Sequence, residues 1–254
     1  MKSATWFWYE LSAEDPAAAA AWYPTFLSWK TEAWPDAAMQ YTVINTASGG
    51  LGGIMVLAPE AKAMGAPPNW MGVVNSEDVD ATVARCKELG GAVIAGPFDI
   101  PTVGRYAVLA DPTGAVFAVL AASGEGEIPS NQELGRVSWN ELWSSDPDAA
   151  FTFYAALFGW VETGTMDMGP SGLYRMYGLT AGGPSLGGIM KKMPEQPVSA
   201  WAFYFNVADV ASALETVKST GGTVVFGPHE VPGGGKMGMC LDPQGAVFAV
   251  YAHG

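Results

Sequence analysis

Two glutamates, Glu10 and Glu141, are the residues of this chain best placed to do chemistry. The frame W-x-E-L-x-x-x-D-P surrounds both, in WYELSAEDP (8–16) and WNELWSSDP (139–147), 131 positions apart. Each carboxylate lies inside a run of large apolar residues, where a charge is costly unless something pairs with it. Such a group could hold a metal ion, act as a general base, accept a hydrogen bond from a ligand, or only brace the fold.

Strand periodicity gives these glutamates aromatic neighbours. Alternation along a strand puts Glu10 on one face with Trp8, and Glu141 on one face with Trp139 and Trp143. If this face lines a pocket, the glutamates are ligand contacts and weak catalytic candidates. The structural alternative is a carboxylate that accepts backbone N–H bonds or pairs with a cation.

Arg105 and Lys236 are the cations at matching positions, each directly after a glycine. They could bind an anionic ligand or pair with the glutamates. The alternative is an ordinary solvated or salt-bridged residue at the start of a strand.

Histidine and cysteine offer little chemistry. His229 lies in GPHEVP, expected to be a loop, and His253 lies next to the C-terminus; neither recurs in the other half. We therefore expect both at the surface, since a facial metal triad needs two histidines and a carboxylate. Cys86 and Cys240 have no C-x-x-C spacing and are expected to be buried thiols in a reducing compartment.

The chain is an internal repeat. Residues 90–121 and 221–252 are identical at 16 of 32 positions, at a constant offset of 131. We predict a first domain at 1–122, a Gly- and Ser-rich linker at 123–135 and a second domain at 136–254. The duplicated halves could form a pseudo-dimer within a monomer, or the chain could be a homodimer.

Each half reads as β-α-β-β-β twice, with helices begun by aspartate. Asp15 and Asp146 suit N-caps, and Pro24 should kink or shorten the first helix. Glycines after 89 and 220 should end two helices, and DPTG and DPQG suit type I turns. The expected helices are 16–28, 77–89, 147–158 and 208–220, and the expected strands are 5–12, 39–46, 51–57, 70–75, 92–95, 104–110, 115–120, 136–143, 173–179, 186–192, 200–206, 223–226, 235–241 and 246–251.

Three motifs, with their first-half copies, carry a family resemblance: DPDAAFTFYAALFGW (146–160), NVADVASALETVKSTGGTVVFGP (206–228) and DPQGAVFAVY (242–251). They resemble the vicinal oxygen chelate superfamily of glyoxalase I, bleomycin-resistance proteins and extradiol dioxygenases. The W-x-E-L strand looks closer to its tandem-domain branch labelled glyoxalase-like or hydroxylase. The resemblance implies an α+β fold of two tandem domains, each with two βαβββ units forming a curved mixed-sheet cup.

The same resemblance implies a divalent metal held by His, Gln or Glu in each cup. Carried over to this sequence, the ligand positions hold side chains that cannot bind such a metal. We therefore predict no metal and no cofactor. The positions are Trp8, Trp139, Ile54 or Met55, Ile189 or Met190, Met71, Ala202, Ala118 and Ala249.

Aromatic residues are many, at 12% of the chain. Core packing must account for most, but Trp139, Trp143 and Tyr204 are predicted to line a pocket for a flat organic ligand. SGGLGGI (48–54) and GGPSLGGI (182–189) do not match a phosphate loop, because each precedes a strand, and we predict a tight hairpin or bulge.

Composition narrows the function classes. A net charge of −13 argues against nucleic acid and against an anionic membrane surface. No signal peptide or membrane span is visible, so the cytoplasm is the expected location.

Three functions remain open. The first is a metal-free protein that binds a small organic ligand, aromatic or drug-like, in a tryptophan-lined cup, with Glu10 or Glu141 as its polar anchor. The second is a glyoxalase-, dioxygenase- or hydroxylase-like enzyme, a lyase or oxidoreductase, with an atypical site on one of these glutamates. The third is a structural protein that kept the fold and lost the site.

Overall fold

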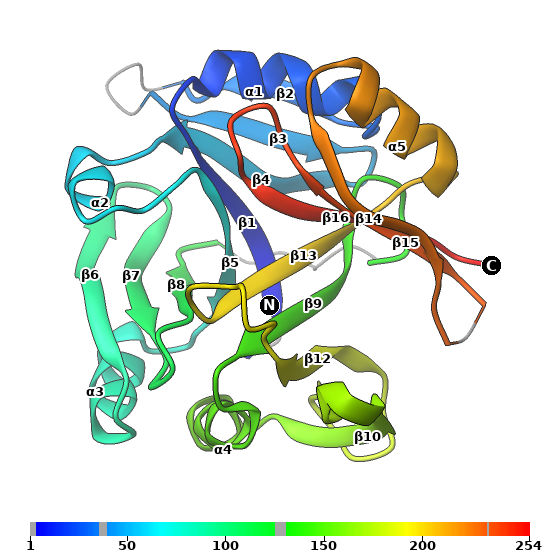
Figure 1. Cartoon of the computed structure of the whole chain (residues 1–254). Helices are drawn as coiled ribbons and strands as arrows, with labels where there is room; N and C mark the ends of the chain where they lie inside the picture. The colour runs from blue at the N-terminus through cyan, green and yellow to red at the C-terminus, as the bar shows by residue number, and fades with distance from the viewer. Residues whose placement is uncertain (1–3, 36–39, 125–130, 233) are drawn as a thin grey trace. The chain divides into compact units, whose positions relative to one another are not determined.

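The computed structural model describes residues 4–35, 40–124, 131–232 and 234–254. Its strands form two mixed, open eight-stranded sheets, in the orders β2-β3-β4-β1-β5-β8-β7-β6 and β10-β11-β12-β9-β13-β16-β15-β14 (Figure 1). The inner strands pair parallel, as β1 does with β4 and β5 with β8, while the outer strands pair antiparallel. The expected α+β fold of repeated βαβββ units is confirmed.

The two halves repeat the same order of strands and main helices, while among the described residues one short helix occurs only in the first half and the 3-10 turns lie at different places. The first half has β1 (Trp6–Ala13), α1 (Pro16–Trp22), η1 (Tyr23–Thr25), β2 (Lys30–Ala33), β3 (Thr42–Thr46), β4 (Gly49–Val56), α2 (Pro59–Ala63), β5 (Asn69–Asn75), α3 (Val79–Glu88), β6 (Ala92–Ile100), β7 (Gly104–Ala110) and β8 (Val116–Ala122). The second has β9 (Val137–Ser144), α4 (Pro147–Phe158), β10 (Val161–Asp167), η3 (Gly169–Ser171), β11 (Leu173–Gly178), β12 (Ser185–Lys191), β13 (Ala200–Asn206), α5 (Val210–Ser219), β14 (Thr223–Glu230), β15 (Lys236–Leu241) and β16 (Val247–Ala252).

The helix boundaries follow from local chemistry. The Asp15 and Asp146 carboxylates accept the backbone N–H of Ala18 and Ala149, which confirms both N-caps. The first helix ends at Trp22 and continues as a 3-10 turn that contains Pro24, as the missing N–H of proline predicts. The helix from 147 to 158 has the predicted bounds.

Several strand predictions need correction. The strands expected at 92–95 and 223–226 run on to residues 100 and 230, because their pairing with the next strand resumes after a register irregularity. Three short elements, β2, β10 and α2, were not predicted, since none shows a clear apolar period. The expected start of one strand at residue 39, and linker residues 125–130, lie outside the described residues.

The chain divides into two compact units, and each unit draws on both halves. Unit 1 comprises Met1–Phe7, Gly72–Ile128 and Trp139–Trp201; unit 2 comprises Trp8–Met71, Pro129–Ser138 and Ala202–Gly254. The predicted domain bounds, 1–122 and 136–254, describe the repeat along the sequence and stay a prediction.

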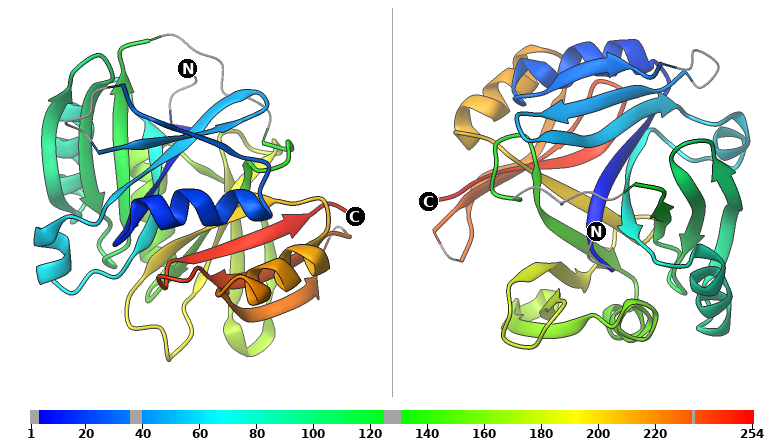
Figure 2. Two further views of the ribbon diagram at one scale, coloured as in Figure 1. Left: turned by 90° about the horizontal axis from the view of Figure 1, so that it is seen from above. Right: turned by 180° about the vertical axis from the view of Figure 1, so that it is seen from behind.

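In unit 2, a helix from the first half is hydrogen-bonded to a segment of the second. The indole of Trp22, the last residue of α1, donates to Thr220 Oγ1 at 2.9 Å, just beyond the end of α5 (Figures 1 and 2). Buried Tyr23 donates to Asp242 Oδ2 at 3.0 Å and accepts from the Trp70 indole at 2.9 Å. An aspartate from the predicted DPQG turn therefore ties the two segments together.

Unit 1 has a matching core with one difference. The Trp201 indole donates to Tyr154 at 3.0 Å, and the Phe117 ring meets that of Tyr154 with centroids 5.4 Å apart. Asp111, from the DPTG turn, accepts N–H bonds from Thr113 and Ala115 through Oδ1. Within the described part of the chain its other oxygen, Oδ2, is buried with no hydrogen-bond partner.

The cysteines are buried free thiols, as predicted. Burial raises the pKa of Cys86 to about 11 and that of Cys240 to about 12. Both thiols are therefore protonated at neutral pH and unsuited to nucleophilic chemistry.

Candidate functional site

In unit 2, Glu10 belongs to a small polar cluster on β1. The Trp8 indole donates to the Tyr41 hydroxyl at 2.7 Å, and that hydroxyl donates to Glu10 Oε1 at 3.2 Å. Glu10 is 7% exposed, whereas Trp8 and Tyr41 are only half-buried. A buried carboxylate thus lies under two aromatic side chains that reach the surface of the unit.

In unit 1, Glu141 forms the same cluster on β9 with one added donor. The Trp139 indole donates to the Tyr174 hydroxyl at 2.7 Å, which donates to Glu141 Oε2 at 2.7 Å. The Trp143 indole donates to Glu141 Oε1 at 2.6 Å. Glu141 is likewise 7% exposed, so both oxygens of a buried carboxylate receive short bonds from neutral donors.

We call these sets the Glu10 cluster (Trp8, Glu10 and Tyr41) and the Glu141 cluster (Trp139, Glu141, Trp143 and Tyr174). The expected strand alternation is confirmed in both. On β1 the intervening residues Tyr9, Leu11 and Ala13 are buried, so each cluster lies on the less buried face of its strand.

Glycines in the neighbouring strands make room for the tyrosines. Gly53 pairs with Glu10, and Gly188 with Glu141, in parallel register. A Cβ at Gly53 would lie 2.0 Å from the Tyr41 ring, and one at Gly188 would lie 2.2 Å from the Tyr174 ring. A side chain at either glycine would collide with the tyrosine ring. The ring therefore needs a glycine at the point where it passes over β4 or β12.

The glycine-rich stretches therefore do two things. The predicted bulge is present in both copies: Leu51 and Leu186 are the extra residues where the register shifts. The following pair of glycines is not part of a turn but lies inside β4 and β12. Their role in seating a tyrosine was not predicted.

Electrostatics keep both tyrosines protonated. Burial, followed by the charge of Glu10, raises the pKa of Tyr41 far above its usual value. Burial, followed by the charge of Glu141, does the same for Tyr174. Each hydroxyl is therefore a hydrogen-bond donor to its carboxylate and not a source of phenolate.

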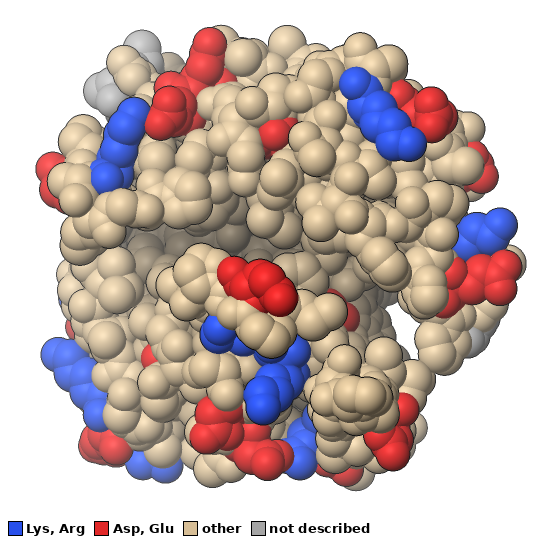
Figure 3. Space-filling view, in the orientation of Figure 1, with Lys and Arg blue, Asp and Glu red and all other residues tan. Residues whose placement is uncertain are grey.

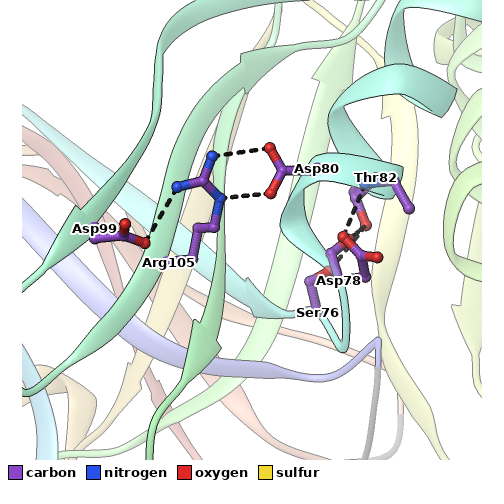
Figure 4. A network of polar contacts seen from close by, with 7 residues as sticks. Ser76, Asp78, Asp80, Thr82, Asp99 and Arg105 are labelled. Atoms are coloured by element: carbon purple, nitrogen blue, oxygen red, sulfur yellow. Dashed lines mark hydrogen bonds and ion pairs between the residues drawn. The ribbon is translucent and has the colours of Figure 1, made fainter.

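Arg105, predicted as a ligand contact, makes its ion pairs elsewhere in unit 1. Its guanidinium bonds Asp80 on α3, with Nη2 2.9 Å from Oδ1, and Nη1 lies 3.1 Å from Asp99 Oδ1 on β6 (Figure 4). The same view shows the N-terminal end of α3. There the Thr82 hydroxyl is hydrogen-bonded to the Ser76 hydroxyl at 2.8 Å and donates to the backbone oxygen of Asp78. These solvent-exposed pairs fit the salt-bridged alternative.

The remaining predicted contacts are less well placed. Lys236 is exposed at the start of β15, where it faces Glu230 across the strand pair. Tyr204 is 7% exposed on β13, paired in register with Ala249. Neither Lys236 nor Tyr204 belongs to the two clusters, and their contact with a ligand stays a prediction.

The donor set at the inherited metal positions does not fit a divalent metal. The indole N–H groups of Trp8 and Trp139 are hydrogen-bond donors, and each already bonds a tyrosine hydroxyl. Ala118 and Ala249 are buried and have only a methyl side chain. In the described ranges, no three His, Cys, Asp or Glu side chains gather as a metal-binding group.

The surface matches the composition. Both histidines are exposed as expected, although His229 lies on β14 and not in a loop. On the face shown in Figure 3, basic and acidic side chains are interspersed, with no basic stripe. Among the described residues, no helix is long and apolar enough to cross a membrane.

Sequence reasoning missed Tyr41 and Tyr174, which complete the clusters. They lie 133 positions apart, where the offset between halves changes from 131 to 135, so the repeat did not align them. The available signal was the paired glycines inside a strand, which often mark a close approach by another group.

Two family models together match most of the chain. The one described as the Glyoxalase/Bleomycin resistance protein/Dioxygenase superfamily matches residues 135–250, and the one described as a Glyoxalase-like domain matches residues 8–120.

Two relatives are similar over nearly the full length. "Putative glyoxylase CFP32" of Mycobacterium tuberculosis is 32% identical over 246 residues, 96% of this chain and 92% of that protein. "Anthracycline biosynthesis protein DnrV" of Streptomyces peucetius is 30% identical over 261 residues, 96% of this chain and 91% of that protein.

Solved structures share the fold at low sequence identity. The Mn(II)-bound glyoxalase from Novosphingobium aromaticivorans has a TM-score of 0.67 at 14% identity, covering 99% of this chain and 83% of that one. Homoprotocatechuate 2,3-dioxygenase from Arthrobacter globiformis has a TM-score of 0.69 at 14% identity, covering 99% and 80%. Likeness at this level of identity speaks to the fold alone.

Proposed function

Because the chain belongs to the glyoxalase, bleomycin-resistance and dioxygenase superfamily, we propose that it binds a small aromatic molecule without a metal ion. The ligand is anchored by a glutamate of the Glu10 or Glu141 cluster and held against tryptophan. Fold alone does not select a function within this superfamily, so the proposal rests on the chemistry of the clusters.

The short bonds around Glu141 are the observation that carries the proposal. Buried Glu141 is held by Tyr174 and Trp143 at 2.7 and 2.6 Å, and this fixes the direction in which the carboxylate points. A carboxylate is an acceptor, so it selects ligands with an O–H or N–H donor. Half-buried indoles at Trp139 and Trp143 supply flat apolar surface for an aromatic ring.

Two further points support a metal-free, aromatic-binding role. The side chains at the inherited ligand positions are indole, thioether and alkyl groups, which do not suit a divalent metal. A relative at 30% identity is named for anthracycline biosynthesis, so at least one relative of similar length works in the synthesis of an aromatic compound.

Calorimetric titration of chelator-treated protein with 2-naphthol tests the proposal. We expect 2-naphthol to bind, and 2-methoxynaphthalene, which lacks the donor, to bind at least ~10-fold more weakly. Adding Mn²⁺ or Zn²⁺ should change neither affinity. Binding that appears only after metal is added, or equal affinity for the two compounds, would contradict the proposal.

A glyoxalase-type reaction is the second candidate, favoured by the name of the mycobacterial relative. Glu141 would then serve as the base, with Tyr174 as a positioning residue. This reading predicts turnover of a glutathione hemithioacetal by purified protein and its loss in Glu141→Gln. Cytoplasmic location and oligomeric state stay predictions in either case.

A further inference from the structure

We propose that each half carries its own ligand site, so that one chain binds two molecules of an aromatic compound with a hydroxyl donor. The two sites would admit ligands of different sizes, because Trp143 narrows the Glu141 site and the smaller Ser12 stands at the matching position of the Glu10 site. This inference rests on the proposed function and adds to it the number of sites, their residues and their selectivity.

The first step is the duplication of the bonds that link tryptophan, tyrosine and glutamate. In each cluster a tryptophan indole donates to a tyrosine hydroxyl at 2.7 Å, and the hydroxyl donates to a buried glutamate. Each tyrosine also crosses a glycine, at which an added Cβ would collide with the ring. Because the tyrosines, the glycines and the bulge beside them all persist in both halves, neither copy has lost its constellation.

The separation of the two clusters is the second step. Trp8, Glu10 and Tyr41 all belong to unit 2, and Trp139, Glu141 and Tyr174 all belong to unit 1. Each constellation is therefore complete within one unit and needs no residue from the other. Two anchors that are complete in separate units can each hold a ligand.

The third step is the difference between Trp143 in one cluster and Ser12 in the other. These residues occupy matching positions, two residues beyond the glutamate and on its face of the strand. In the Glu141 cluster the indole lies beside the carboxylate and bonds it at 2.6 Å. In the Glu10 cluster Ser12 holds that position, and its small hydroxymethyl side chain would admit a larger ligand than the Trp143 indole does.

Stoichiometry with two probes tests this inference. Titration with 2-naphthol, which has two rings, should give two molecules per chain. Glu10→Gln and Glu141→Gln should each weaken one site at least ~10-fold and leave the other. The three-ring probe 9-phenanthrol should bind once per chain, and lose that site in Glu10→Gln but not in Glu141→Gln.

Swapping the size-setting residues sharpens the test. Ser12→Trp should abolish 9-phenanthrol binding while 2-naphthol still binds twice. Trp143→Ser removes the narrowing indole but leaves Trp139 as the aromatic surface, and should raise 9-phenanthrol binding to two per chain. Thermal unfolding of every variant checks folding, and Tyr41→Phe and Tyr174→Phe replace any glutamate variant that fails to fold.

The outcomes separate this inference from the function it rests on. One 2-naphthol per chain, or two that neither glutamate variant affects, would overturn the two-site inference and leave metal-free binding in place. Variants that lose stability while stoichiometry stays at two would overturn it as well, since the clusters would then be structural. No binding of 2-naphthol to wild-type protein would overturn the proposed function itself.

Discussion

The Glu10 and Glu141 clusters have the same three bonded residue types but differ in the hydrogen bonds that tyrosine and tryptophan donate to the carboxylate. Tyr41 donates to Glu10 at 3.2 Å, whereas Tyr174 and Trp143 donate to Glu141 at 2.7 and 2.6 Å. Duplication thus preserved the arrangement and changed the tightness of these bonds. A similar contrast holds for the turn aspartates of the two units: Tyr23 donates to Asp242 Oδ2, but Asp111 Oδ2 has no hydrogen-bond partner among the described residues.

The largest expected effect comes from filling the glycine under a tyrosine. Gly188→Ala puts a methyl group 2.2 Å from the Tyr174 ring and should lower the free energy of unfolding by about 3 kcal/mol. Gly53→Ala should cost about the same. Chemical denaturation measures both, with Gly124→Ala as a matched control, because nothing lies within 4 Å of its added Cβ.

A double-mutant cycle shows whether collision with the Tyr174 ring causes the loss of stability in Gly188→Ala. In a Tyr174→Ala background, Gly188→Ala should cost about 1 kcal/mol or less, because the methyl group no longer meets the ring. An unchanged cost in that background would mean that the glycine serves the strand and not the tyrosine.

Removal of the tyrosine hydroxyls compares the clusters directly. Tyr174→Phe should lower the free energy of unfolding by about 2 kcal/mol, since a buried carboxylate loses a short bond and the Trp139 indole loses its acceptor. Tyr41→Phe should cost about 1 kcal/mol, because its bond to Glu10 is longer. Equal costs would remove the claimed difference in tightness.

Trp143 is the residue that separates the clusters. Trp143→Phe keeps an aromatic ring but loses the N–H bond to Glu141, and should cost about 1.5 kcal/mol. Ser12→Ala, the matched change in the other cluster, should stay within about 0.5 kcal/mol. A larger loss for Ser12→Ala than for Trp143→Phe would reverse the comparison.

Asp111 should make the stability of the protein depend on pH. Burial raises the pKa of Asp111, although the bonds that the Thr113 hydroxyl and the N–H groups of Ala115 and Thr113 donate to Oδ1 partly oppose the shift. A carboxyl whose folded-state pKa is raised destabilises the fold above that pKa, and the penalty fades as the pH falls and the group protonates. Asp111→Asn should therefore be more favourable relative to wild type at pH 7 than at pH 4.

Asp242→Asn is the counterpart. It keeps the acceptor for the turn N–H groups but loses the Oδ2 acceptor of Tyr23, and should cost about 1 kcal/mol at pH 7. Melting temperatures across pH 4–8 check both variants. A cost of Asp111→Asn at pH 7 as large as that of Asp242→Asn would contradict the difference between the units.

The fold could be predicted from sequence where a local rule applied. Aspartate caps, Pro24 and the glycines at 90 and 221, whose φ values are +86° and +97°, set boundaries through backbone geometry alone. Alternation on β1 and β9 placed Glu10 and Glu141 on the correct face. Short edge strands such as β2 lack a period because their side chains are mostly exposed, so no pattern revealed them.

The candidate site was only half predictable. The glutamates and tryptophans stand together in one motif, so one strand placed them. Tyr41 and Tyr174 come from a segment 31 and 33 residues further along the chain, and strand pairing alone brings them to the carboxylates. Arg105 was a candidate because its sequence position matches that of Lys236. In the fold its guanidinium forms ion pairs with Asp80 and Asp99.

One measurement tests the central claim most directly: a crystal structure of chelator-treated protein soaked with 2-naphthol. We predict a naphthol ring against a cluster tryptophan, with its hydroxyl oxygen about 2.7 Å from the carboxylate of Glu10 or Glu141, and no metal density beside it. A naphthol bound elsewhere, or a metal ion between the hydroxyl and the carboxylate, would contradict the account.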